Sequence, residues 1–379
     1  MVIENVPQLK YCVWVTAVML ICAQPHLAQT TATPSVVNLR EYDWEPPEPI
    51  HPHEIDTPGT RSIVIDHKSR ILVGFTVKKN SGLVTRDNPA FSYHVVRFTP
   101  NGKVNLSLSL PANGWRNNSL YLSDTDQIIV RANDKLQLLQ SGPDLKPENI
   151  SWKVMAACAL RCRIIQSPSR RTLLLYAWDV NPPVTVFDLA QFPNAEQCEK
   201  PPYPVQAITD KFAYYTGQNR QLQLFSYRWP LCDYNHHVEM PIHLPGNYAV
   251  LNDESFVTDI DFKTDKYIDN HLYVISSDGH PKFKEAMAKH ERWAPIRGSE
   301  QGNRIAVDML TERGGNQRLD LSAHLTARRI VVYDINIGKE LASIPINLKH
   351  HYEYEFDFSP DGHRLAILED DIVKVVDIE

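Results

Sequence analysis

The chain contains little glycine, 15 residues among 379, and many more prolines, 27. Because glycine adopts positive φ more easily than any other residue, we expect proline to define many of the turns and strand ends. The chain also lacks a positive net charge. The formal charge is −6, which argues against non-specific binding to nucleic-acid phosphates. The apolar content of 43% and the charged content of 22% are those of a globular protein with a substantial core.

The sequence also lacks the common catalytic motifs. It contains no Gly-x-Ser-x-Gly nucleophile elbow, no His-Glu-x-x-His zinc motif, no phosphate-binding loop and no dinucleotide fingerprint. No enzyme class is therefore indicated, and a non-catalytic role is favoured.

The apolar run near the N-terminus is short for a membrane span. Tyr11–Ala23 covers 13 uncharged residues, a length typical of the core of a secretory signal. A buried N-terminal strand or helix is the alternative. We predict a signal peptide over residues 1–28 and a secreted or periplasmic protein without a stable membrane span. Candidate cleavage positions follow Ala23, Ala28 and Ala32.

Removal of residues 1–28 leaves four of the six cysteines: Cys158, Cys162, Cys198 and Cys232. In an oxidising compartment an even number favours two disulfides, and four cysteines allow three connectivities. Cys158 and Cys162 are close enough in sequence to be neighbours. Free buried thiols are the alternative. A zinc site is disfavoured because no second Cys or His pair lies nearby in the sequence.

A Pro-rich leader over residues 29–59 is followed by strand patterns almost to the end of the chain. In 352–358 aromatic residues alternate with acidic ones, which indicates a half-buried strand. Ser359-Pro-Asp-Gly362 has proline and glycine where a hairpin turn with a following bulge needs them. The stretches 99–102 and 334–338 repeat this chemistry. We therefore expect short hairpins between strands that are adjacent in sequence.

Strands that end in an aromatic or aliphatic residue before a turn recur along the chain, with an average spacing of about 46 residues. A repeat of this length, built of about four short strands, is the signature of a β-propeller. The sequence thus predicts an all-β fold, a single propeller of about seven four-stranded blades over residues 60–379. The seven marker residues are Phe98, Leu138, Phe187, Phe225, Ile275, Tyr333 and Val376.

The C-terminal strands resemble a known class of propeller. Val331-Val-Tyr-Asp-Ile-Asn-Ile-Gly-Lys339 and Phe356-Asp-Phe-Ser-Pro-Asp-Gly-His-Arg-Leu365 are similar to the strand-turn-strand elements of WD-repeat-like and YVTN-type propellers. The eukaryotic Trp-Asp signature is not in the repeat position. The chain therefore resembles divergent secreted bacterial propellers more than signalling WD-repeat proteins.

The last blade is one strand short. Strands near 352–358, 364–368 and 372–378 account for three, and the ring needs a fourth to avoid unpaired sheet edges. We predict that the N-terminal segment Val36–Arg40 supplies it.

One segment has a helical pattern. In Asp278–Trp293 the apolar residues Phe283 and Met287 lie on one helical face, and Pro281 lies near the first turn. We predict a helical insertion near 278–293. Its basic residues suit either contact with an anionic partner or an ordinary solvated face: Lys282, Lys284, Lys289 and Arg292.

Candidate metal ligands are few. Asp259 and Asp261 would lie on one face of a strand. Calcium-dependent propeller lactonases hold their metal with Asp, Asn and Glu around the central channel, so the resemblance makes these two residues candidates. Calcium takes six to eight oxygen ligands, and solvent-facing or turn-stabilising roles are the alternative. The histidines of His51-Pro-His53-Glu54 suit a metal as well, or a solvated leader.

Two functions are consistent with these observations. The leading hypothesis is a non-catalytic binding or protein-interaction scaffold without a cofactor, whose protein or small-molecule ligand binds at one mouth of the channel. The rival is a propeller hydrolase or lactonase with a divalent cation in the channel. A quinoprotein-like propeller is a third hypothesis that no particular residue favours.

Overall fold

The computed structural model describes residues 35–42 and 61–379. The second range has gaps at 79–89, 113–117, 142–149, 159–161, 178–183, 191–194, 199–204, 206, 217–222, 229–236, 244–247, 260–261, 265–266, 270, 279, 289–290, 302, 313–324, 348–353 and 370. The chain divides into two compact units, Met1–Thr31 and Ala32–Glu379. The predicted signal peptide and most of the predicted leader lie outside the described residues. No helix in the described part of the chain is long and apolar enough to cross a membrane.

The described strands of the second unit form seven four-stranded sheets and one two-stranded hairpin, all antiparallel. The first sheet contains β2 (Arg61–Ile65), β3 (Ile71–Lys78), β4 (Phe91–Phe98) and β5 (Val104–Ala112). The second contains β6 (Ser119–Leu122), β7 (Ile128–Ala132), β8 (Lys135–Ser141) and β9 (Ile150–Ala157). The third contains β10 (Cys162–Gln166), β11 (Thr172–Ala177), β12 (Val184–Asp188) and β13 (Ala195–Cys198).

The remaining sheets continue this order along the chain. The fourth contains β14 (Ala207–Ile208), β15 (Phe212–Thr216), β16 (Gln223–Arg228) and β17 (His237–His243). The fifth contains β18 (Tyr248–Val250), β19 (Phe256–Asp259), β22 (His271–Ile275) and β23 (Pro281–Ala286). The sixth contains β24 (Glu291–Gly298), β25 (Arg304–Glu312), β26 (Leu325–Asp334) and β27 (Lys339–Pro345). The seventh contains β28 (Tyr354–Phe358), β29 (Arg364–Glu369), β30 (Ile372–Asp377) and β1 (Ser35–Asn38).

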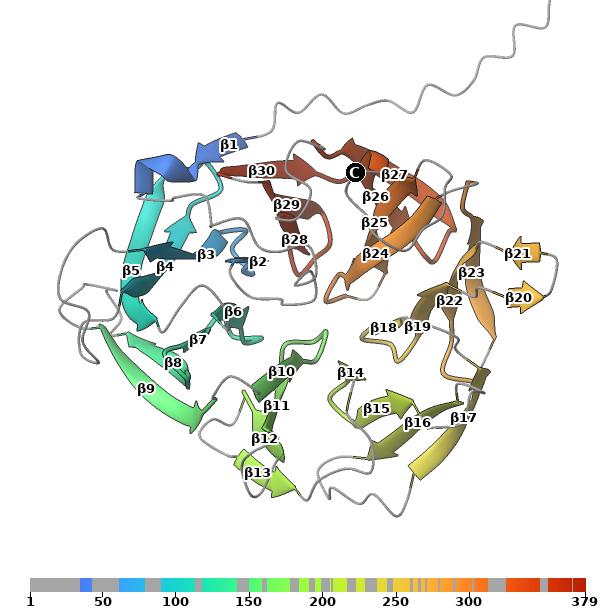
Figure 1. Cartoon of the computed structure of the whole chain (residues 1–379), viewed down its shortest axis with the longest axis horizontal. Helices are drawn as coiled ribbons and strands as arrows, with labels where there is room; N and C mark the ends of the chain where they lie inside the picture. The colour runs from blue at the N-terminus through green and yellow to red at the C-terminus, as the bar shows by residue number, and fades with distance from the viewer. Residues whose placement is uncertain are drawn as a thin grey trace, which may run out of the picture. The chain divides into compact units, whose positions relative to one another are not determined.

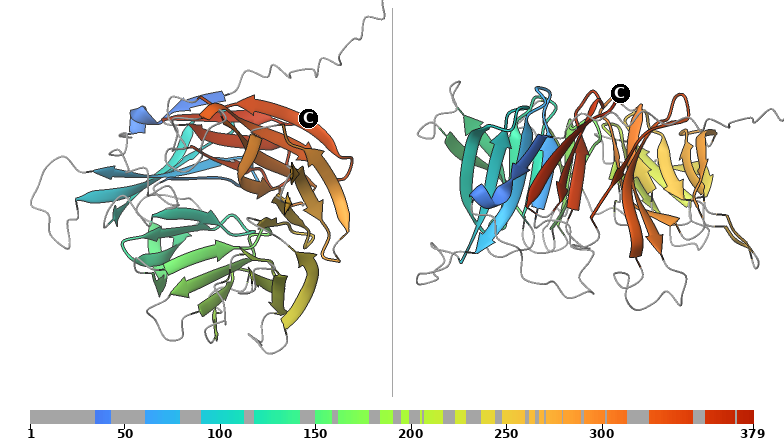
Figure 2. Two further views of the ribbon diagram at one scale, coloured as in Figure 1. Left: turned by 45° about the vertical axis from the view of Figure 1, so that its right-hand side comes forward. Right: turned by 90° about the horizontal axis from the view of Figure 1, so that it is seen from above.

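The seven sheets are arranged around a centre, each with its first strand innermost and its last strand at the periphery (Figure 1). Viewed from the side, their strands run between two faces of the unit (Figure 2). The Ala32–Glu379 unit is a seven-bladed β-propeller. The predicted fold class is confirmed, and each of the seven marker residues lies in the third strand of its blade.

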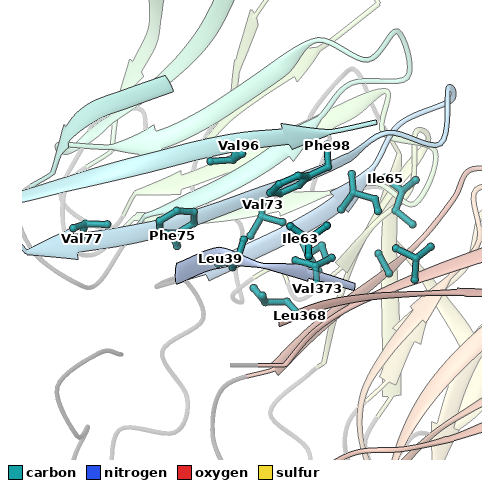
Figure 3. Close-up of a cluster of buried hydrophobic side chains, with 14 residues drawn as sticks. Leu39, Ile63, Ile65, Val73, Phe75, Val77, Val96, Phe98, Leu368 and Val373 are labelled. Carbon is teal, nitrogen blue, oxygen red and sulfur yellow. The ribbon is translucent and has the colours of Figure 1, made fainter. Parts of the chain in front are cut away.

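The N-terminal strand closes the ring, as predicted. β1 pairs with β30 in an antiparallel register in which Ser35 lies opposite Val375 and Asn38 opposite Ile372. A 3-10 helix, η1 (Leu39–Tyr42), follows at once. We call Ser35–Tyr42 the latch. The Leu39 side chain is fully buried among residues of the seventh and first blades, including Leu368 and Ile63 (Figure 3).

The core lies between neighbouring blades. Each apolar cluster combines side chains of two consecutive sheets, so every blade is covered on both faces by its neighbours. This explains why central strands such as β3 and β7 have consecutive buried residues instead of an alternating pattern. The outer strand β5 alternates because it faces solvent on one side.

The predicted helix near 278–293 is wrong. Pro281–Ala286 is the outer strand β23 of the fifth blade, and β24 begins at Glu291. Phe283 and Met287 are both buried, as the helical pattern required, but in β23 Phe283 alternates with the exposed Lys282 and Lys284. Pairing with β22 outweighed helix propensity here. The insertion in this blade is instead the hairpin of β20 (Phe262–Thr264) and β21 (Tyr267–Asp269).

A disulfide joins Cys158 to Cys162 between the second and third blades, with 5.2 Å between their Cα atoms. This is one of the pairings that the sequence left open. Cys198 is also disulfide-bonded, and Cys232 lies outside the described residues.

Replacing Cys158 and Cys162 together with alanine is expected to lower the free energy of unfolding by about 2 kcal/mol, because the bridge closes only a short loop. Both residues are buried, so reductant should not open the bridge in the native protein. Urea denaturation of the double variant and the wild type measures the difference. An unchanged midpoint would contradict a stabilising role.

Candidate functional site

The same turn recurs between the first and second strands of the blades. It begins with a serine, threonine or aspartate whose side chain accepts a hydrogen bond from a backbone N–H three to five residues later. The turn is thus stabilised by this side-chain bond and not by glycine or proline alone. The acceptors, with the residues that donate to them, are Asp66 (Arg70), Ser123 (Gln127), Ser167 (Thr172), Thr209 (Phe212), Ser299 (Arg304) and Ser359 (Arg364).

The fourth residue of this turn has positive φ in several blades. Glycine occupies the position in the seventh blade, where Gly362 has φ 73°. Elsewhere the left-handed residue carries a side chain, which explains how the chain builds its turns with so little glycine. These residues are Ser69 (55°), Asp126 (62°), Arg170 (61°) and Glu254 (63°).

Polar contacts join these first turns into a circuit, which we call the mouth ring. Within the described residues, each blade contacts the next through its first turn or the strand before it. The contacts are His67 with Asp126, Arg171 with Asp124, Ser169 with Asp210, Lys211 with Glu254, Asn252 with the Glu300 carbonyl, the Gln301 N–H with the Pro360 carbonyl, and the Ile65 N–H with Asp357.

Arg170 links the turn of its own blade to two other blades. It belongs to the turn of the third blade, yet its guanidinium donates to the Ile65 carbonyl at 2.6 Å and to Asp357 Oδ2 at 3.0 Å, in the first and seventh blades. A longer bond of 3.3 Å reaches the Phe358 carbonyl. Arg170 is only 9% exposed. Burial raises the pKa of Asp357, and the positive charge of Arg170 opposes this shift. The pair thus ties the third blade to the first and seventh blades.

A pocket of about 220 Å³ opens at the mouth ring. The turns of the first, sixth and seventh blades line it, with Asp66, His67, Ser69, Glu300, Gln301, Ser359, Pro360 and Asp361.

His67 lies between two carboxylates in this pocket. Its Nδ1 is 2.9 Å from Asp126 Oδ1, and its Nε2 is 3.5 Å from Glu300 Oε2. Burial lowers the pKa of His67, but the Asp126 hydrogen bond and the negative charges of Glu300 and Asp126 outweigh it. The pKa is therefore raised above the ordinary value of 6.5.

Two carboxylate oxygens near the pocket are buried without a hydrogen-bond partner. They are Glu300 Oε2 and Asp124 Oδ1. Burial raises the pKa of Glu300, the charges of Arg170 and His67 oppose the shift, and the negative charge of Asp124 reinforces it. These two carboxylates are therefore close enough to interact electrostatically, and each has an oxygen that lacks a hydrogen-bond donor.

The candidates from the sequence are not brought together. Asp259 ends β19, where it pairs with Leu272; its side chain and the whole of Asp261 lie outside the described residues, as do His51 and His53. Within the described residues, no group of three or more His, Cys, Asp or Glu is placed to hold a metal ion. The calcium hypothesis therefore stays a prediction.

The basic residues of the predicted helix are also dispersed. Lys282 pairs with Asp253 at 2.6 Å, and the Lys284 ammonium lies 5.2 Å from the Tyr273 ring centre. Lys289 and the side chains of Arg292 and Trp293 lie outside the described residues.

No family model and no curated protein matches the chain. Solved structures with WD40 and other propeller folds are similar to it. The C-terminal WD40 domain of Sif2 has a TM-score of 0.47 at 12% identity, covering 84% of this chain and 95% of that one. A catalytically inactive virginiamycin B lyase from Staphylococcus aureus with quinupristin has 0.48 at 14%, covering 85% and 96%. Oligogalacturonate lyase in complex with manganese has 0.46 at 10%, covering 82% and 94%. At these identities the likeness concerns the fold alone.

Proposed function

We propose that this propeller is an exported binding module that holds a small polar ligand in the pocket at its mouth ring. One observation carries the proposal: Glu300, which lines the pocket, has a buried carboxylate oxygen, Oε2, without a hydrogen-bond donor. An unsatisfied buried polar group costs about 1–3 kcal/mol, and more when it is charged. A ligand that donates a hydrogen bond to Glu300 would remove that cost.

The rest of the mouth supports a preformed site. Hydrogen bonds and ion pairs between successive turns fix the rim, and Arg170 with Asp357 ties the third blade to the seventh. A rigid site loses little conformational entropy when its ligand binds. We favour a small molecule over a protein partner because a pocket of about 220 Å³ has the scale of a small ligand. The Cys158–Cys162 disulfide suits the oxidising compartment that export implies.

A thermal-shift screen tests this proposal. A library of small polar metabolites should contain compounds that raise the melting temperature of the wild type, since a ligand at 100 times its Kd stabilises by about 2.7 kcal/mol. The same compounds should have a much smaller effect on Glu300→Gln, because the amide replaces one carboxylate oxygen with a donor.

The matched control is Glu196→Gln on β13, where the side chain is exposed. It should respond as the wild type does. If every stabilising compound acts equally on Glu300→Gln, the pocket is not the binding site and the proposal is wrong.

A further inference from the structure

We propose that the ligand of the mouth pocket is a small organic cation, such as a primary amine, and that a proton on His67 competes with it. This inference rests on the proposed binding function. It combines the charge balance of the mouth with the position of one histidine between two carboxylates.

The arginines at the mouth are neutralised by neighbouring carboxylates. Three arginines at the mouth are each paired with an aspartate: Arg70 with Asp66, Arg170 with Asp357, and Arg171 with Asp124. Each pair cancels its own charge.

The acids left over are Asp126, Glu300 and Asp361, and His67 is the group that faces the first two. These four groups together carry a net negative charge whether or not His67 is protonated. Such a site attracts cations and repels anions.

The unpartnered oxygens specify the kind of cation. A metal ion needs several ligands at short, fixed distances, and the described side chains are not grouped in that way. Glu300 instead lines the cavity with a carboxylate whose Oε2 lacks a hydrogen-bond donor, and the negative charge of Asp124 acts on it. An ammonium group has three N–H donors and a compact charge, so an amine satisfies such acceptors while filling more of the pocket than an ion would.

His67 supplies the competing proton. The groups that act on it from the elements packed around it are Asp126 from the β6–β7 turn, Glu300 from the β24–β25 turn and Arg170 from the β10–β11 turn. With Nδ1 facing Asp126 and Nε2 facing Glu300, protonated His67 can donate to both carboxylates. Glu300 is then satisfied internally, and the added positive charge repels a cationic ligand.

The sign of the pH effect follows from this geometry. Neutral His67 leaves Glu300 Oε2 free for the ligand, so affinity for a cation should rise as the pH rises through the pKa of His67. That pKa is raised above 6.5. Protonation of Glu300, whose pKa is also raised, weakens binding in the same direction at lower pH.

Three four-carbon probes, one a dication, one neutral and one a dianion, provide the test: butane-1,4-diamine, butane-1,4-diol and butanedioate. Isothermal titration calorimetry of the full chain at about pH 8.5 should show binding of the diamine. The diol and the dianion should bind at least about tenfold more weakly. Glu300→Gln should weaken diamine binding by about tenfold, whereas Glu196→Gln should not change it.

The competition is tested with the same diamine at about pH 6 and pH 8.5. The wild type should bind it about tenfold more tightly at the higher pH. His67→Gln should remove most of this difference. His363→Gln is the matched control, because His363 lies in the seventh-blade turn beside Asp361 but does not line the pocket; it should keep the difference.

Each outcome decides a separate part of the proposal. Equal or tighter binding of the diol or the dianion would overturn the cation assignment and leave the binding function in place. Diamine binding that is independent of pH, or that keeps its pH dependence in His67→Gln, would overturn the proton competition. If none of the probes binds up to about 10 mM, the cation inference is wrong, while the library screen still decides the binding function.

Discussion

Leu39→Asp is expected to prevent the propeller from folding stably. Leu39 is fully buried in the cluster that joins the seventh blade to the first. Truncation of a buried leucine to alanine alone costs about 2–5 kcal/mol, and a buried unpaired charge adds several more. Ordinary domains have only about 5–15 kcal/mol of stability in total. The change also releases the latch, which leaves the edge of β30 unpaired.

Circular dichroism and urea denaturation measure this effect, and size-exclusion chromatography reports aggregation through the open edge. Leu39→Met conserves volume and should cost less than about 1.5 kcal/mol. Glu41→Gln is the neighbouring control, because Glu41 is an exposed residue of the same latch. A Leu39→Asp protein with the melting temperature of the wild type would show that the latch does not contribute to the stability of the ring.

Arg170→Met is expected to lower the free energy of unfolding by about 3–5 kcal/mol, the usual cost of removing one partner of a buried ion pair. The substitution leaves Asp357 buried without its cation and deprives the Ile65 and Phe358 carbonyls of a donor. Methionine retains much of the length of the side chain, so the loss reports charge and hydrogen bonding more than volume. Urea denaturation provides the measurement.

The adjacent arginine is a matched control. Arg171 also pairs with an aspartate, Asp124, but its side chain is 64% exposed, and an exposed pair contributes only about 0–1 kcal/mol. Arg171→Met should therefore be nearly neutral. Combining Arg170→Met with Asp357→Leu should recover much of the loss, because it removes the unpaired charge. If Arg170→Met is as stable as Arg171→Met, the buried pair does not contribute to the stability of the ring.

The sequence predicts much of the fold because blades are built from local hairpins. Third strands end in large apolar residues such as Phe98 and Tyr333, since these positions are buried against the preceding blade of the ring. The Ser359–Gly362 turn has the positive φ at Gly362 that its residues indicate. The closing strand could be predicted for another reason. Three C-terminal strands require a fourth to complete their blade, and Val36–Arg40 has strand-forming residues.

The error at 278–293 has a clear physical origin. A single buried phenylalanine flanked by lysines fits both a helix and the outer strand of a blade. Each of these elements buries only some of its residues and leaves the others exposed. Lys, Glu, Ala and Met favour the helix by intrinsic propensity. The decisive contacts, with β22, lie before the segment in the sequence and cannot be read from its own period.

The candidate site was missed because its residues come from different turns. His67, Asp126 and Glu300 are each unremarkable in their own segment, and only ring closure brings them together. A signal was nevertheless present. Serine, threonine or aspartate recurs at the start of the first turn, but the left-handed position is occupied by residues such as Arg170 instead of glycine, which hides the relation to the Ser359 turn.

The pairing of β1 with β30 has a consequence for the order of folding. Most blades consist of strands that follow one another in the chain, so their hairpins can form early. The seventh blade joins Ser35 to Val375, which makes the first described strand the partner of the last. Closure between such distant segments carries a large entropic cost and is slow compared with local hairpin formation. We therefore expect the blades to assemble first as an open arc, which becomes a ring when β1 and β30 meet.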